Sequence, residues 1–332
     1  MDSLLANFSA ARVRRAPLRA GAFGPTDALR LLDGAGDGPE FTGLTIDDFA
    51  GRWLVSTKNL PPPDWLRQVA PAPRAIYWKR LEVKDKEPPQ FWAGERVAAP
   101  FEIVENGLRF QVDFAAGYSQ GIFLDQRDNR AALRRWCAAT EHREAPAAVL
   151  NLFAYTCAFS VAAAAAGAQT VSVDLSSVSL TRGRENFQLN QLDPTPASGH
   201  EFYAADAREF LRRAAKRGRR FDAIVLDPPT FSRDRDGKIF RVERDFGALV
   251  ALAFPLLRAG GIMLCSTNQR TLSPLTFDRL LASGLPADGG SGLRRRSAPM
   301  PADFAGEPYL QSVWIERGRT SDADNYALFA AR

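Results

Sequence analysis

Cysteine, histidine and long apolar runs are scarce in this chain of 332 residues. Its 3 cysteines are too few for a disulfide framework and fit a reducing compartment. Its 2 histidines, with no CxxC or HxxxH spacing, argue against a zinc site. No apolar run approaches the roughly 20 residues that a membrane helix needs. The N-terminal arginines follow a short apolar stretch, whereas a signal peptide places its positive charge first. We therefore expect a soluble, cytoplasmic protein with no membrane or metal partner.

The composition is that of a folded globular protein. Hydrophobic residues make up 45% and charged residues 24% of the chain, which argues against disordered and fibrous classes. At roughly 150 residues per domain, the length predicts about two domains. The formal net charge is +5 and the pI is near 9.3, which permits a polyanionic partner without requiring one.

The pattern of the chain changes near residue 120. Before it, prolines such as those at 61–63 interrupt any long helix, and short strands are predicted at 43–46, 53–56 and 75–78. A hairpin is predicted over 101–112, because Asn106-Gly107 is a strong turn signal. We expect residues 1–115 to form a small accessory α/β domain.

Over residues 116–332, apolar strands alternate with amphipathic helices. Strands are predicted at 149–153, 170–174, 201–204, 221–226, 262–265 and 309–316. One of the helices is expected to end at Arg258–Gly261, because glycine is common at helix C-termini. Repeated strand–helix units imply right-handed crossovers, so we expect a doubly wound α/β fold on a parallel sheet.

Polar residues follow successive predicted strands of this sheet. Asn151, Asp174, Asp206 and Asp227 lie at or just after their carboxyl ends, which meet at one edge. A carboxylate after the second strand suits the two ribose hydroxyls, and an acceptor after the third suits an adenine amino group. Each aspartate alone could instead cap the helix that follows it. The whole set favours a ligand of the nucleoside type.

The loop after the first strand of this sheet, NLFAYTCAFS, contains no glycine. A dinucleotide site would want G-x-G-x-x-G here, so that the backbone could approach the diphosphate closely. A phosphate-free cofactor such as S-adenosylmethionine tolerates this loop better, since side chains and backbone groups can hold its carboxylate and ammonium.

Several strings of the sequence resemble a known enzyme family. They are GIFLDQRDNR (121–130), VLNLFAYTCAFSVAAAAAGA (149–168), VSVDLS (171–176), FDAIVLDPPTFS (221–232) and LLRAGGIMLCSTN (256–268). Together they resemble class I S-adenosylmethionine-dependent methyltransferases, and more narrowly the 23S rRNA methyltransferases that make 5-methylcytosine or 7-methylguanosine. The resemblance covers roughly residues 40–316 and implies a seven-stranded Rossmann-like sheet, S-adenosylmethionine as cofactor and RNA as partner. We expect the usual N-terminal PUA-type RNA-binding domain to be absent or reduced to a stub.

The resemblance implies a role for each matching residue. The residues expected to hold the cofactor are Phe123, Asp125, Arg127, Asn151, Phe153, Tyr155, Thr156, Asp174, Asp206 and Asp227. Within that set, Asp174 would hold the ribose and Asp206 the adenine, and the loop after the first strand would surround the methionine part. The residues expected at the catalytic centre are Asp227, Pro228, Pro229, Phe231 and Asn268. The sequence departs from the family at Cys157, where glycine is usual, and at Gln120, where threonine is more usual.

The target atom depends on a missing cysteine. Methylation of cytosine C5 needs a thiolate that adds to C6. The cytosine-modifying relatives keep it seven residues after the second glycine of a GG pair, and here that position is Asn268. Cys265 and Cys137 are expected to be buried packing residues. The segment STNQR resembles the guanine-N7 relatives, as does the charged loop after DPPTFS, so N7 is predicted and cytosine C5 remains the alternative.

Guanine N7 needs neither a nucleophile nor a general base, because its lone pair is free. Positioning supplies most of the catalysis, and Asp227 would stabilise the cationic product. Asn268 could hydrogen-bond the guanine edge, and Phe231 could stack on the base or belong to the core.

Basic clusters occur at 212–220, 294–296 and among Arg12, Arg14 and Arg15. Such clusters suit an RNA substrate, although the first could equally be a solvated helix face. Residues 1–115 could also contact RNA. A small-molecule methyltransferase and a non-catalytic RNA-binding protein are the remaining alternatives.

Overall fold

The computed structural model describes residues 2–58, 60–81, 87–98, 100–139, 145–233, 239–286 and 292–318. The chain forms two compact units. The first contains Met1–Ala131 and Met300–Pro308, and the second contains Ala132–Pro299 and Tyr309–Arg332. The chain therefore passes between the units three times. The domain boundary expected at residues 115 and 116 stays a prediction.

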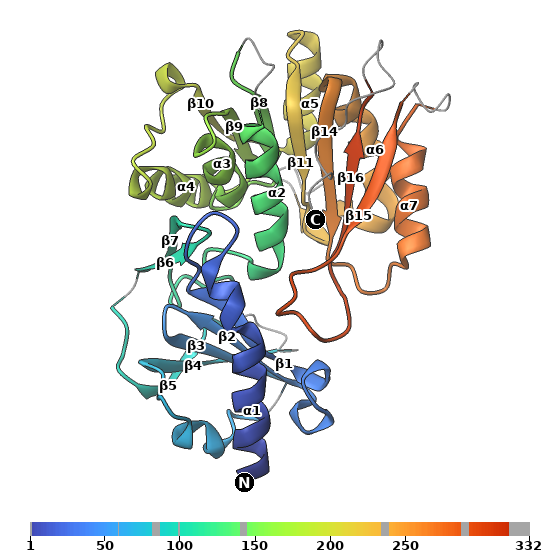
Figure 1. Ribbon diagram of the computed structural model, residues 1–332. Helices are drawn as coiled ribbons and strands as arrows, with labels where there is room; N and C mark the ends of the chain where they lie inside the picture. Colours follow the sequence, from blue (N-terminus) through green and yellow to red (C-terminus); the bar gives the residue numbers. More distant parts are fainter. Residues whose placement is uncertain are drawn as a thin grey trace. The chain divides into compact units, whose positions relative to one another are not determined.

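A mixed sheet and a helix form most of the first unit (Figure 1). The sheet has the order β1-β2-β3-β4-β5, with strands at Ala28–Asp33, Leu44–Phe49, Arg52–Thr57, Ala75–Arg80 and Gln90–Gly94. Only β3 and β4 pair in parallel among these neighbours. The helix α1 (Asp2–Arg15) buries Phe8 edge-on against Trp53 and Trp65, which anchors it to the unit's core.

The predicted hairpin is confirmed. β6 (Phe101–Glu105) and β7 (Leu108–Val112) pair antiparallel around Asn106 and Gly107, whose φ angles are 51° and 75°. Both angles are positive, as a tight type I′ turn requires. Short 3-10 turns of this unit lie at Ala16–Ala20, Gly34–Gly36, Pro39–Phe41, Asp64–Gln68 and Leu124–Gln126.

The second unit contains a seven-stranded sheet of order β10-β9-β8-β11-β14-β16-β15. In that order, its strands are His200–Ala204, Gln169–Asp174, Ala148–Leu152, Phe221–Leu226, Leu257–Thr267, Gln311–Glu316 and Arg294–Ala298. The strands from β10 to β14 are parallel, and β16 runs antiparallel to both of its neighbours. A two-stranded hairpin, β12 (Phe231–Arg233) with β13 (Ile239–Arg241), follows β11. The expected α/β architecture is confirmed.

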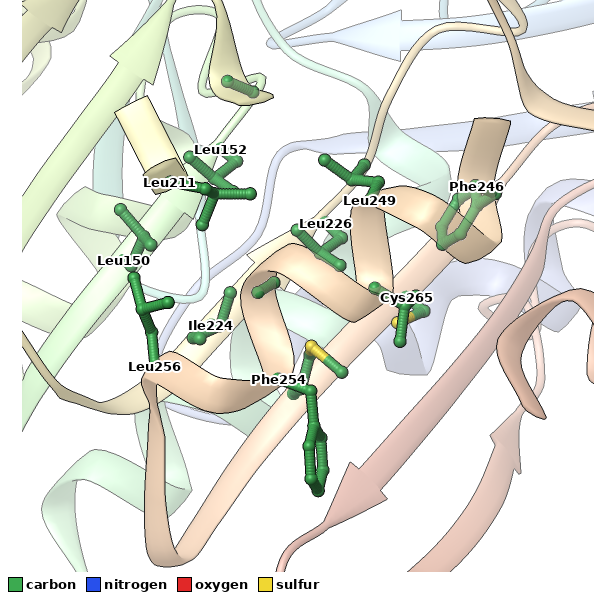
Figure 2. Packing of buried hydrophobic residues seen from close by; sticks show 14 of the residues in the cluster. Leu150, Leu152, Leu211, Ile224, Leu226, Phe246, Leu249, Phe254, Leu256 and Cys265 are labelled. Atoms are coloured by element: carbon green, nitrogen blue, oxygen red, sulfur yellow. The ribbon is translucent and has the colours of Figure 1, made fainter. Parts of the chain in front are cut away.

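Helices cover both faces of this sheet because alternate strand residues are apolar on both sides. Leu150, Leu152, Ile224 and Leu226 point to one face and pack with α5, α6 and α7, as Figure 2 shows for Leu211, Phe246 and Leu249. These helices span Ala207–Lys216, Val242–Ala253 and Pro274–Ser283. The intervening residues, such as Val149 and Val225, pack on the other face with α2 (Arg127–Ala138) and α3 (Ala158–Ala164). The helix α4 spans Ser177–Leu189.

The expected helix end at Arg258–Gly261 is wrong. Helix α6 ends at Ala253, and a 3-10 turn over Phe254–Leu256 contains Pro255, which cannot continue an α-helix. Arg258–Gly261 already belongs to β14, where the pairing jumps from Phe221–Leu257 to Ala223–Ile262. The glycines therefore serve an irregularity inside a strand, which is another common use of glycine.

The order of the parallel strands reverses between β8 and β11. From β8 the chain proceeds outward through β9 and β10, and then returns to β11 on the other side of β8. In open α/β sheets, ligands bind at the carboxyl ends of the strands beside such a reversal. The loops after β8 and β11 are therefore the first place to look for a site.

Candidate active site

The loop after β8 has a strained backbone. Phe153, Tyr155 and Cys157 have φ angles of 59°, 49° and 62°, in the left-handed region that side chains disfavour. The Ala154 N–H donates to the Val173 carbonyl (3.0 Å), and the Asn186 side chain donates to the Thr156 carbonyl (2.9 Å). Strain of this kind persists only when the surroundings impose it, and it gathers at functional sites.

Asp174 ends β9 and holds this loop through its carboxylate. The Tyr155 N–H donates to Oδ2 and the Ser176 N–H donates to Oδ1, both at 2.8 Å. Burial raises the pKa of Asp174, while these two N–H groups lower it, and the net shift is upward. Each oxygen accepts only one of these bonds, so lone pairs are left for a further donor such as a ribose hydroxyl.

Asp206 has a different environment, although it occupies the equivalent place after β10. Its Oδ1 accepts from the backbone N–H of Arg208 (2.9 Å) and of Glu209 (3.1 Å), so it is the N-cap of α5. Its Oδ2 is paired with the Arg208 guanidinium (3.1 Å). Burial raises the pKa of Asp206, but the hydrogen bonds from Arg208 and Glu209 lower it by more. The net shift of this pKa is therefore downward. Helix capping is thus an established role of Asp206, and its contact with adenine stays a prediction.

Asn151, in β8, and Thr156, within the loop, are both buried. Asn151 is only 2% exposed, and its amide donates to Ser160 Oγ (3.0 Å), which in turn lies 2.8 Å from Ser172 Oγ. The Asn151 contacts tie β8, α3 and β9 together, so Asn151 supports the loop whether or not it also touches a ligand.

The expected catalytic residues follow β11 and β14. Asp227 is partly buried, Pro228 is buried and Pro229 is exposed directly after β11. Phe231 is 49% exposed, and the Arg241 guanidinium lies 5.7 Å from its ring centre. A core position for Phe231 is therefore excluded. Asn268 is exposed just after β14 ends. The charged loop expected to follow DPPTFS lies partly outside the described residues, at 234–238.

All cysteines of the chain are buried, as expected for Cys137 and Cys265. Burial raises the pKa of Cys265, which lies inside β14, and it raises the pKa of Cys157 to about 12. A Cβ placed on Gly183 of α4 would lie 2.4 Å from the Cys157 Sγ, so that glycine makes room for the unusual cysteine. Gly183 and Asn186 thus support the loop from α4. They were not predicted, although a glycine inside a helix pattern is a signal of close packing.

Three expected cofactor contacts belong to the first unit. Phe123 is 48% exposed and Asp125 is partly buried. The Arg127 guanidinium is buried and donates to both carboxylate oxygens of Asp303, at 2.6 Å and 3.0 Å. Arg127 therefore has a structural partner within its unit, and the roles of these residues toward a cofactor stay predictions.

The donor set at the strand ends fits S-adenosylmethionine. Asp174, Asp206 and Asp227 place carboxylates at one edge, where they would repel a diphosphate and attract a cofactor with a cationic sulfonium and ammonium. In the described part of the chain no cluster of His, Cys, Asp or Glu could hold a metal ion. Within that same part, no helix has both the length and the apolar character needed to cross a membrane.

Comparisons with known proteins agree with this fit. The Bacillus subtilis protein YwbD, named provisionally as a ribosomal RNA large subunit methyltransferase, is 35% identical over 263 residues, which cover 76% of this chain and 63% of that protein. Ribosomal RNA large subunit methyltransferase I of Shewanella denitrificans is 32% identical over 85% of this chain and 71% of its own length. The crystal structure of SMU.776 complexed with SAH is 29% identical, with a TM-score of 0.80 over 95% of this chain and 81% of that chain.

A family model also matches this chain. The model describes S-adenosylmethionine-dependent methyltransferases and matches residues 30–285, well over half of the chain. This chain therefore belongs to the S-adenosylmethionine-dependent methyltransferase family.

Proposed function

We propose that the protein transfers a methyl group from S-adenosylmethionine to N7 of a guanine in large-subunit ribosomal RNA. The names of its relatives support ribosomal RNA as the substrate class. The choice of guanine N7 over cytosine C5 rests on the burial of all its cysteines. Ribosomal RNA as substrate would place the enzyme in the cytoplasm.

The strand ends would hold the cofactor, which supplies an electrophilic methyl group when bound. Asp174 would accept hydrogen bonds from the ribose hydroxyls, and Asp206 would accept one from the adenine amino group. The loop from Asn151 to Thr156, with Phe153 and Tyr155 in its strained part, would enclose the methionine part. We propose that Phe123, Asp125 and Arg127 also contact the cofactor.

The residues after β11 and β14 would hold the base. Phe231, half-exposed, offers a ring on which guanine can stack, and Asn268 offers an exposed amide for its edge. N7 keeps a free lone pair and loses no proton, so positioning and charge carry the catalysis. Asp227 would stabilise the positive charge that develops on the purine, above the floor that Pro228 and Pro229 form.

Cytosine C5 chemistry fits the buried thiols poorly. It needs a thiolate that reaches C6, and reactive cysteines combine exposure with a lowered pKa. Cys265 is fully buried in β14 and its pKa is raised. Cys137 and Cys157 are also buried. A reaction that requires no thiolate is therefore favoured.

The test is a product analysis. Protein-free 23S rRNA is incubated with the purified enzyme and S-adenosylmethionine, then digested to nucleosides for mass spectrometry. We expect new 7-methylguanosine. New 5-methylcytosine would overturn the choice of atom, and a lack of cofactor binding in calorimetry would overturn the enzymatic function. Methylation of small molecules alone would remove RNA as the substrate.

We also propose that residues 1–115 act as an accessory domain that contacts RNA, with residues 116–332 as the methyltransferase domain. The support is the basic residues of the N-terminal helix. Arg12 is partly exposed and Arg14 is exposed, although Arg14 also pairs with Asp37 (2.7 Å). Arg15 is buried against the same Asp37 and so belongs to the structure of the unit.

A further inference from the structure

A polar cavity lies at the edge of the parallel sheet where the strands begin, opposite to the candidate active site. It has a volume of about 640 Å³, and its wall includes Ala148, Gln169 and Phe221, the first residues of β8, β9 and β11. Arg258, near the start of β14, also lines it. The candidate active site lies at the carboxyl ends of these same strands. At roughly 3.3 Å per residue, the six residues of β11 separate the two edges by about 20 Å.

Arginines dominate the charge of this cavity, which we call the basic cleft. Arg217, Arg219, Arg220 and Arg258 line it together with Glu201. Carboxylates hold two of the arginines in place. Arg219 donates to both oxygens of Glu201 at 2.7 Å and 3.1 Å, and Arg258 donates to Asp222 at 2.7 Å. These two side chains are therefore both positioned and neutralised.

The other two arginines carry uncompensated charge. Arg217 and Arg220 are exposed, and neither pairs with a carboxylate among the residues that the structure describes. Among the described residues, the Arg220 guanidinium donates to the Arg219 carbonyl, at 2.9 Å. A concave surface over an apolar sheet focuses such charge. A guanidinium fork also matches the two oxygens of a phosphate.

Helix capping explains this charge only in part. Arg217 is the C-cap of α5, where a cation offsets the negative end of the helix dipole. Arg213 and Lys216 already supply cations to the last turn, and Arg220 lies beyond the helix, after Gly218. The charge of Arg220 therefore has no structural role in the helix.

We propose that the basic cleft binds backbone phosphates of RNA, through Arg217 and Arg220, at the edge of the sheet remote from methyl transfer. This rests on the proposed RNA substrate. Of the basic segment 212–220, only the residues that line the cleft are then expected to contact RNA. An RNA that reaches both edges must follow the second unit for about 20 Å, so substrate recognition would extend well beyond the target base.

The test compares two charge-matched double variants of the full chain. Arg217→Gln/Arg220→Gln removes the cleft charge, and Arg212→Gln/Lys216→Gln removes equal charge from exposed positions of α5 that do not line the cleft. Binding of a 23S rRNA transcript is measured over a series of salt concentrations. Loss of two phosphate contacts should lower the salt slope by roughly 1.4 to 1.8 and the affinity about 25- to 60-fold at 0.1 M salt. The control pair should lose less than about threefold.

The outcomes separate this inference from the proposed function. Equal losses of RNA affinity in both double variants, or an unchanged salt slope in the cleft variant, would overturn the proposal that the cleft binds phosphates. The proposed methylation of RNA would be unaffected by either result. A wild-type protein that neither binds nor methylates the transcript would overturn both. The affinity for S-adenosylmethionine and the unfolding temperature should match the wild type in both double variants. A cleft variant that unfolds early would assign Arg217 and Arg220 to stability, and the inference would fail.

Discussion

In the first unit, some of the ion pairs are buried in the interior, whereas the described ion pairs of the second unit lie nearer to solvent. Arg127–Asp303 and Arg130–Glu105 keep side-chain exposures of 5% or less. The pairs Arg219–Glu201 and Arg295–Asp278 leave between 27% and 46% of each side chain exposed. The interior of the second unit is instead the apolar packing on both faces of its sheet.

Charged residues thus stabilise the interior of the first unit, whereas in the second unit they lie where a ligand could bind. A buried ion pair depends on both partners, because either charge alone is costly in the interior. The apolar sheet of the second unit needs no charge for its core. Charged residues of the second unit lie instead at the two edges of that sheet, where we propose that they meet the cofactor and RNA.

The largest effect should come from Asp303→Ala. This change leaves the Arg127 guanidinium buried without its carboxylate partner and also removes the acceptor of the Arg30 N–H (2.9 Å). Breaking a buried pair by removing one partner costs about 3–5 kcal/mol. Urea unfolding of the full chain, with hydrogen exchange to locate the loss in the first unit, provides the measurement.

Asp278→Ala is the matched control, since it breaks the exposed Arg295–Asp278 pair (2.8 Å). It should cost less than about 1 kcal/mol. If Asp303→Ala and Asp278→Ala lowered the free energy of unfolding equally, the two units would not differ in how they use ion pairs.

Asp174→Ala tests the second unit at its cofactor edge. The lost charge-assisted bonds to ribose are worth about 1.5–3 kcal/mol, which weakens S-adenosylmethionine binding roughly ten- to a hundredfold. The backbone N–H groups of Tyr155 and Ser176 also lose their acceptor, so the loop should exchange hydrogen faster. Calorimetry measures the dissociation constant. An unchanged constant would remove Asp174 from the site.

Asn268→Ala tests the base side of the same edge. Losing one orienting hydrogen bond should cost about 1–3 kcal/mol, a rate loss of about five- to two-hundredfold, with cofactor affinity unchanged. Asn268→Cys should create no cytosine activity, because the pocket for guanine would remain. Single-turnover rates with 23S rRNA give the measurement. Full activity of Asn268→Ala would overturn the assignment.

A smaller effect should appear in the pH dependence of cofactor binding. Asp174 must be ionised to accept hydrogen bonds with full charge, and its raised pKa means that acidification neutralises it before an ordinary aspartate of pKa 3.8. Affinity should therefore fall as the pH decreases toward that pKa, and Asp174→Asn should abolish the dependence. Asp206, whose pKa is lowered, stays ionised over the same range. Calorimetric titrations from neutral pH downward check this, and identical curves for wild type and Asp174→Asn would contradict it.

Local pattern was enough to predict the parallel sheet and its carboxyl edge. The mostly apolar strands β9 and β11 end at or just before a carboxylate, Asp174 and Asp227, so their ends could be read directly. The edge strand β15 was missed because Arg294, Arg295 and Arg296 look like a charged loop, and only the sheet beside them makes a strand of that segment. The helix α1 was missed because its short apolar stretch lacks a strong helical period.

Contacts between distant segments could not be predicted at all. Cys157 and Gly183 fit together across two helices, and neither residue alone reveals the other. The basic cleft joins residues from the starts of several strands, which approach one another only in the folded sheet. Arg127 matched the family pattern and was assigned to the cofactor, but its structural partner Asp303 is 176 positions away in the sequence.

The placement of Met300–Pro308 in the first unit has a consequence for biosynthesis. Arg15 donates to the Asp303 carbonyl, and 288 positions separate the two residues. At about 5–20 residues per second, a ribosome reaches Asp303 roughly 15–60 s after Arg15. During that interval the buried arginines of the first unit await their last partners, while nearly all of the second unit is being made. The N-terminal part of this protein is therefore translated first, but it cannot complete its fold until nearly the whole chain has been made.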